Sequence, residues 1–85
     1  MNLKFELKKN GSTDGILTVD VDESGNIKSL SCTNTSIEKA IKIAHNLDYL
    51  KRFVRCTVSG IMCSDQIEIS FGSRLNVSYK IIQMA

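Results

Sequence analysis

Residues 35–50, TSIEKAIKIAHNLDYL, have the spacing of one amphipathic helix. The apolar residues recur at the i, i+3, i+4 and i+7 positions of a stripe that faces a core: Ile37, Ala40, Ile41, Ile43, Ala44, Leu47 and Leu50. Thr35 and Glu38 are spaced as a capping box, in which each side chain accepts a hydrogen bond from the other residue's backbone amide. We expect the helix to span residues 36–50, because one further residue would turn Lys51 into the apolar stripe.

Stretches of alternating apolar and polar residues flank the expected helix on both sides. Residues 3–8, 17–22 and 27–32 precede it, and residues 54–59, 66–71 and 75–81 follow it. Such alternation is typical of strands with one buried face. The sequence therefore predicts a single α+β domain over residues 1–85, with an antiparallel sheet in the order β-β-β-α-β-β-β and the one helix packed on one sheet face. The expected core includes Phe5, Val19, Ile41, Ala44, Leu47, Ile69 and Val77.

The register of the first three strands predicts an apolar patch on the back of the sheet. Pairing Phe5 with Val19 aligns the apolar positions of the first two strands. A three-residue loop, with Gly25 in the left-handed conformation, would then pair Val21 with Ile27. In that register three residues gather on the face away from the helix: Ile16, Leu30 and Cys32. Contiguous exposed apolar area marks interfaces, so these three residues form one candidate partner-binding surface.

The alternation of the last two strands also limits the length of the loop that connects them. A two-residue turn would place polar groups opposite the apolar positions of the partner strand. A loop over residues 72–74 pairs Phe71 with Leu75 instead, and the alternation is kept on both strands. We therefore expect the odd-numbered loop.

The composition and charge of the chain limit the classes of protein to which it can belong. The chain has 85 residues, of which 24% are charged and 42% hydrophobic, which is ordinary for a folded domain. The net charge of +2 is too small to indicate nucleic acid or an anionic membrane by itself. Residues 1–9 alternate charge with apolarity and lack the apolar centre of a signal peptide. The sequence therefore predicts a cytoplasmic protein with no membrane partner.

The cysteines and the single histidine do not have the spacing of a reactive or metal-binding site. Cys32, Cys56 and Cys63 contain no C-x-x-C pair, so we expect all three to be reduced. Zinc held by these thiols and His45 would need closely spaced ligand pairs. A cysteine–histidine nucleophilic pair would need the two side chains in contact, and the histidine is expected on the outer helix face. We expect no catalytic residue, no metal and no cofactor.

The outer face of the helix is the second candidate surface. It carries basic residues around one aromatic side chain: Lys39, Lys42, His45, Tyr49 and Arg52. Tyrosine and arginine are enriched at protein–protein hot spots, although the same basic groups could contact phosphates, or the face could simply be solvated.

These features favour a small non-enzymatic protein-binding module, an inhibitor or adaptor of a larger protein complex. Small phage-type and bacterial-type inhibitors often have this size and lack catalytic motifs, and this comparison is an analogy only. Self-association through the sheet back is a further expectation. The alternative is a nucleic-acid-binding module that uses the basic helix face. Base stacking on the sheet would require exposed aromatic residues, and Phe5, Phe71 and Tyr79 all fall on inward positions, which makes nucleic acid the less favoured partner.

Overall fold

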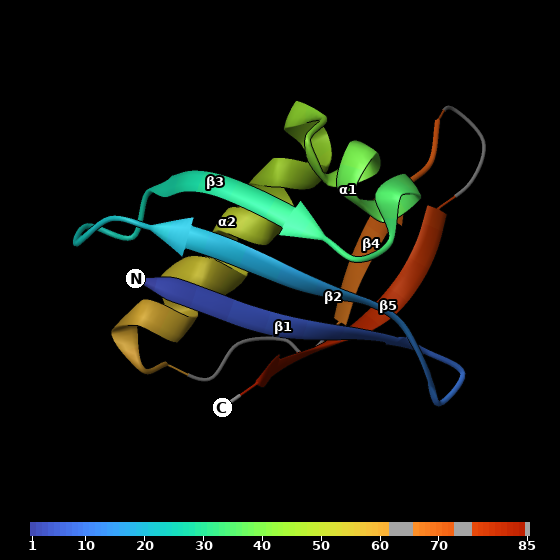
Figure 1. Ribbon diagram of the computed structural model, residues 1–85, viewed down its shortest axis with the longest axis horizontal. Coiled ribbons are helices and arrows are strands. Elements are labelled where there is room, and N and C mark those ends of the chain that lie inside the picture. The colour runs from blue at the N-terminus through green and yellow to red at the C-terminus, as the bar shows by residue number, and fades with distance from the viewer. Residues whose placement is uncertain (62–65, 73–75, 85) are drawn as a thin grey trace.

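Five antiparallel strands form one curled sheet beside two helices (Figure 1). The computed structural model describes residues 1–61, 66–72 and 76–84. The strands are β1 (Asn2–Lys9), β2 (Ser12–Val21), β3 (Ile27–Cys32), β4 (Gln66–Ser70) and β5 (Asn76–Met84). They pair in the order β3-β2-β1-β5-β4, so the C-terminal hairpin joins the N-terminal meander through β5 and β1. The expected mixed fold with an antiparallel sheet is confirmed, and β3 and β4 are its edge strands.

The helical region differs from the expected single helix. It consists of α1 (Thr35–Ile41) and α2 (Ala44–Ser59), with extended backbone at Ile43 between them. The predicted strand over residues 54–59 is wrong, because these residues complete α2. Figure 1 shows α2 passing behind the three N-terminal strands, while α1 lies at the end of β3.

The break at residues 42–43 explains why the helix end was misplaced. After the break the buried face of α2 is formed by Asn46, Leu50, Phe53 and Val54. Lys51 is therefore turned away from the core centre, and the helix continues without burying a charge. It ends at Gly60, whose left-handed conformation lets the Ile61 amide donate to the Cys56 carbonyl at 2.9 Å.

The start of α1 uses a different cap from the predicted capping box. The Asn34 side chain, rather than Thr35, accepts hydrogen bonds from the amides of Ser36 and Ile37. Glu38 accepts from the Cys32 amide at 2.8 Å instead of from the Thr35 amide. The carboxylate thereby ties the first helix to the end of the edge strand β3.

The registers of the first two hairpins also differ from expectation. Phe5 pairs with Leu17 rather than with Val19, a shift of two residues that keeps the same side chains inward. Asn10 and Gly11 both have left-handed backbone, with φ of 52° and 80°. They form the tight two-residue turn for which the Asn-Gly sequence is a strong signal. The turn pairs Lys9 with Ser12 and Lys8 with Thr13, and a register shift between Leu7 and Lys8 then pairs Phe5 with Leu17.

The β2–β3 hairpin contains a bulge that the alternation did not predict. Val21 pairs with Ile27, and Gly25 is left-handed, as expected. A register shift between Asp20 and Val21 then moves every following pair by one residue. A shift of one residue reverses which face each side chain occupies.

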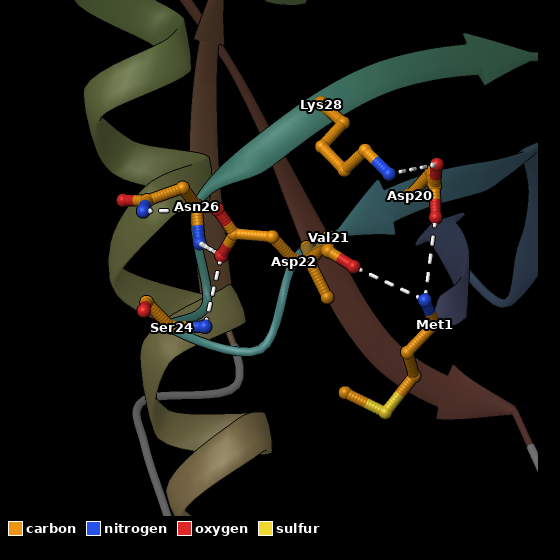
Figure 2. A network of polar contacts seen from close by, with 7 residues as sticks. All are labelled: Met1, Asp20, Val21, Asp22, Ser24, Asn26 and Lys28. Carbon is orange, nitrogen blue, oxygen red and sulfur yellow. Dashed lines mark hydrogen bonds and ion pairs between the residues drawn. The ribbon is translucent and has the colours of Figure 1, made fainter.

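Polar contacts at this turn hold the end of the sheet together, as Figure 2 shows. The Asp22 carboxylate accepts from the amides of Ser24 and Asn26, each at 2.9 Å. The amino group of Met1 donates to the Val21 carbonyl at 3.1 Å and lies 3.4 Å from the Asp20 carboxylate. Met1 is therefore held against the end of β2 by a hydrogen bond and an ion pair.

The core lies between the helices and the inward face of the sheet. Four of the predicted core residues are buried there: Phe5, Val19, Ile41 and Ile69. Leu47 and Val77 are partly buried against it, whereas Ala44 is exposed and that prediction is wrong. In the last hairpin Ile69 pairs with Val77, the register that the odd-numbered loop requires, although Leu75 lies outside the described residues. Asn46 is the one polar residue buried with the core in the described part of the chain.

Candidate partner-binding surface

The start of α2 brings together three of the five predicted helix-face residues. His45, Tyr49 and Arg52 follow one another at helical spacing and, with Asp48, line a shallow hollow of about 240 Å³. The rings of His45 and Tyr49 meet edge to face, with their centroids 5.0 Å apart. Arg52 lines the same hollow, so two aromatic rings and a guanidinium group lie around it.

Lys39 lies apart from these three residues, in a second hollow. This hollow, of about 290 Å³, lies where α1 and the helix break meet the end of β4, and Lys39, Ile43 and Phe71 are among its lining residues. Ile43 is 54% exposed, which is high for a large aliphatic side chain. Five residues that line these hollows, together with Lys42 beside Ile43, are called the helical surface below: Lys39, Lys42, Ile43, His45, Tyr49 and Arg52.

Lys42 forms an ion pair with Glu38 of α1. Its ammonium lies 3.3 Å from one oxygen of Glu38, whose other oxygen accepts from the Cys32 amide. The Cys32 amide, followed by the Lys42 side chain, lowers the pKa of the Glu38 carboxyl. Asp48 adds a second carboxylate and lies 3.7 Å from the ammonium of Lys51. The helical surface therefore carries both signs of charge.

Sequence analysis missed Ile43 because of the helix break. In an unbroken helix Ile43 would widen the apolar stripe, as predicted. Its extended backbone instead directs the side chain to solvent between α1 and α2. No glycine or proline marks this break in the sequence, so hydrophobic periodicity alone could not reveal it.

The predicted patch on the sheet back is wrong in two of its three residues. The bulge at Lys28 of β3 pairs Leu30 with Val19 and Cys32 with Leu17, so Leu30 and Cys32 turn inward and pack against the core. Ile16 keeps its outward position and is partly buried. It is separated from Ile82 by Glu6, which pairs with both. The contiguous apolar area that motivated self-association through this face is absent from the described residues.

The cysteines also depart from expectation. Cys56 is disulfide-bonded, so the prediction that every cysteine is reduced is wrong at that position. Cys32 is free, and burial raises the pKa of its thiol. Cys63 lies outside the described residues. Within the described ranges no group of histidine, cysteine and carboxylate side chains is arranged to hold a metal ion.

Neither helix in the described part of the chain has the length and apolarity needed to cross a membrane. No protein-family model, curated protein or solved structure matches this chain.

Proposed function

We propose that this chain is a small non-enzymatic protein-binding module, an inhibitor or adaptor of a larger complex, that contacts its partner through the helical surface. The exposure of Ile43 carries this proposal. A large aliphatic side chain that lines a hollow and is 54% exposed is an anchor that a complementary surface could bury. Tyr49 and Arg52 beside it are residue types enriched at interaction hot spots.

A binding role rather than a catalytic one is supported by the state of the nucleophilic and basic groups. The Cys32 thiol has a raised pKa, so at neutral pH it is protonated and a poor nucleophile. The His45 ring packs edge-on against Tyr49 and serves as part of a contact surface. These two groups would otherwise be the natural candidates for covalent or acid–base chemistry.

The charge pattern favours a protein partner over nucleic acid. Nucleic-acid affinity rests largely on lysine and arginine groups that neutralise phosphates. Here Lys42 already pairs with Glu38, and Asp48 adds a carboxylate beside Arg52. A surface of mixed sign with an exposed isoleucine suits a protein surface better than a phosphate backbone.

A cytoplasmic location was predicted from the sequence and stays a prediction. The disulfide bond at Cys56 weighs against it, because such bonds persist chiefly in oxidising compartments.

The test uses a matched pair of isoleucine substitutions. Ile43 and Ile61 are both exposed, at 54% and 65%, but only Ile43 lies on the helical surface. The tagged chain and the variants Ile43→Asp and Ile61→Asp would each be used for affinity capture from the native host, with quantification by mass spectrometry. We expect one protein to be captured by the parent and by Ile61→Asp, and about tenfold less of it by Ile43→Asp, since a lost hot spot is worth more than 1 kcal/mol. Equal capture by both variants would refute the helical surface as the site.

A further inference from the structure

The hollow of about 290 Å³ beside Ile43 has an apolar lining that contains a single charged group. Ala40, Ile43 and Phe71 supply the apolar side chains, and Lys39 is the one charged residue in the described lining. Three small residues complete that lining: Ser36, Ser70 and Gly72. Such a recess fits an apolar group that is accompanied by a charge of opposite sign, because apolar contact supplies affinity and the charged group selects the ligand.

Hydrogen bonds fix the positions of the three elements that form this hollow. The Asn46 side-chain amide donates to the carbonyls of Ala40 and Ser70, at 2.8 Å and 3.0 Å, so the start of α2 joins the end of α1 to the end of β4. The Ile43 amide donates to the Ala40 carbonyl at 3.2 Å, and the Ile43 carbonyl accepts from the Leu47 amide at 2.9 Å. Figure 1 shows α1 beside β4, and the two elements are in contact. Because the backbone around the hollow is already held in place, a ligand would not have to order it on binding.

The two helices carry an excess of positive charge that their own carboxylates do not neutralise. Residues 35–59 contain five lysine and arginine residues and two carboxylates. Both carboxylates are paired within the helices, Glu38 with Lys42 and Asp48 with Lys51. The other three basic residues of the helices are exposed and form no ion pair in the described part of the chain: Lys39, Arg52 and Arg55. The helical surface is therefore of mixed sign but positive on balance, which is complementary to an acidic partner.

Lys39 is the positive group that the hollow itself offers. The described lining of the hollow includes no acidic residue. Glu38, the next residue in the sequence, is occupied elsewhere, since one of its oxygens accepts from the Cys32 amide and the other lies 3.3 Å from the Lys42 ammonium. A carboxylate brought to Lys39 by a partner would therefore meet a positive charge without a competing carboxylate in the described lining.

We propose that this hollow receives one large apolar side chain of the partner protein, leucine or phenylalanine, while an aspartate or glutamate next to it in the partner's sequence pairs with Lys39. This inference rests on the proposed function and names the kind of segment that the helical surface binds. Ile43 packs against the inserted side chain, and Lys39 selects the acidic neighbour. A nucleic acid would bring phosphates to Lys39 but no apolar side chain for the hollow.

The first test is selection from a random peptide library displayed on phage, with the immobilised full chain as bait. We expect the enriched peptides to carry aspartate or glutamate next to leucine or phenylalanine. Lys39→Glu reverses the one charge of the described lining, so the enriched peptides should then carry lysine or arginine in that position. Lys4→Glu is the matched control, because Lys4 is another exposed lysine without an ion pair in the described chain but lies on β1. It should select the same peptides as the parent.

The second test measures the ion pair separately with one enriched peptide and a counterpart that has glutamine in place of its acidic residue. We expect the glutamine peptide to bind the parent about threefold to fivefold more weakly, because the pair is partly exposed. The two peptides should bind Lys39→Gln equally, since the partner of the carboxylate is then missing. NMR shift changes in the parent should appear at Lys39, Ile43 and Gly72.

Four outcomes would overturn the proposal: no enriched sequence, enriched peptides without acidic residues, an unchanged charge preference in Lys39→Glu, and shift changes that leave the hollow unaffected. Displacement of the enriched peptide from Lys39 by a lower concentration of a single-stranded oligonucleotide would overturn it as well. The NMR spectrum of each free variant reports whether the fold is kept, and Lys39→Gln repeats the comparison should Lys39→Glu not fold. If these tests fail while Ile43→Asp still loses the native partner, the helical surface remains the binding site and only the kind of segment is wrong.

Discussion

At the scale of single residues, Asn46 joins three elements of the fold. Its side-chain amide donates to the Ala40 carbonyl at 2.8 Å and to the Ser70 carbonyl at 3.0 Å, and its oxygen accepts from the Ser70 amide at 3.1 Å. It thereby adds a second hydrogen bond to the Ala40 carbonyl at the end of α1, which also accepts from the Ile43 amide, and it satisfies both backbone groups of Ser70 on β4. The polar character of Asn46 placed it on the outer helix face in the sequence, and only the helix break turns it inward.

Replacing this side chain should destabilise the chain strongly. Asn46→Ala removes three hydrogen bonds, and two of them leave the amide and the carbonyl of Ser70 without these partners. Because an unsatisfied buried polar group costs about 1–3 kcal/mol, we expect a loss of about 2–4 kcal/mol in the free energy of unfolding. Urea denaturation measures this loss. His45→Ala, on the exposed neighbour, is the control, and equal midpoints for the two variants would contradict the role assigned to Asn46.

Asp22 should make stability depend on pH. Hydrogen bonds from the backbone and side chain of Asn26, assisted by the Ser24 amide, hold the pKa of the Asp22 carboxyl below its ordinary value. A carboxyl with a lowered folded pKa stabilises the fold above its unfolded pKa, and this contribution is lost as the pH falls through the folded pKa. The stability difference between the parent and Asp22→Asn should therefore be greatest near neutral pH and shrink in acid. Thermal melts of both chains across this range test the trend, and a difference that stays constant into acid would contradict it.

At the scale of elements, the sequence predicts the inward residues of strands better than it predicts where a helix breaks and which helix face is buried. The inward residues of β1, β2 and β4 follow the alternation, and the last hairpin has the expected pairing of Ile69 with Val77. Residues 54–58 satisfy two periods at once. Val54, Cys56 and Val58 alternate as in a strand, while Leu50, Phe53 and Val54 also continue a helical stripe. Periodicity cannot choose between these patterns when an unmarked break changes the phase upstream.

The bulge at Lys28 makes a specific prediction about the rest of β3. Leu30 packs against the core, and Ser31 beside it is exposed. We expect Leu30→Asp to lower the unfolding free energy by about 2–4 kcal/mol, because it removes apolar contacts and brings a charge to the core margin. Ser31→Asp should change it by less than about 0.5 kcal/mol. Thermal or urea unfolding of the two variants checks the register. A stable Leu30→Asp variant with altered association would restore the sheet-back patch.

At the scale of the whole molecule, the candidate surfaces depend on tertiary structure more than on local sequence. His45, Tyr49 and Arg52 were predictable because helical spacing fixes their common face. The pairing of Lys8 with Lys80 was not predictable, because these two residues meet only when β5 inserts beside β1. The exposure of Ile43 likewise follows from the break and not from any residue pattern.

The oxidation state of the molecule can be measured directly. Because Cys56 is disulfide-bonded and Cys32 is free, we expect the intact mass to rise by two hydrogen atoms on reduction. One thiol should react with an alkylating agent before reduction, and only slowly in the folded state, since burial raises its pKa. Cys32→Ser should keep the mass change and lose that reactive thiol. Three reactive thiols in the unreduced, unfolded chain would contradict the disulfide.

The contacts of Glu38 and Asn46 with the edge strands have a consequence for how the chain behaves in concentrated solution. An open sheet edge is a template on which further chains can add, and repeated addition leads to fibrils. Glu38 occupies the Cys32 amide at one edge, and Asn46 occupies both backbone groups of Ser70 at the other. Each helix therefore blocks the addition of a further strand at the sheet edge it borders. Weakening these contacts should shorten the lag before fibril formation, even at temperatures where most of the protein remains folded.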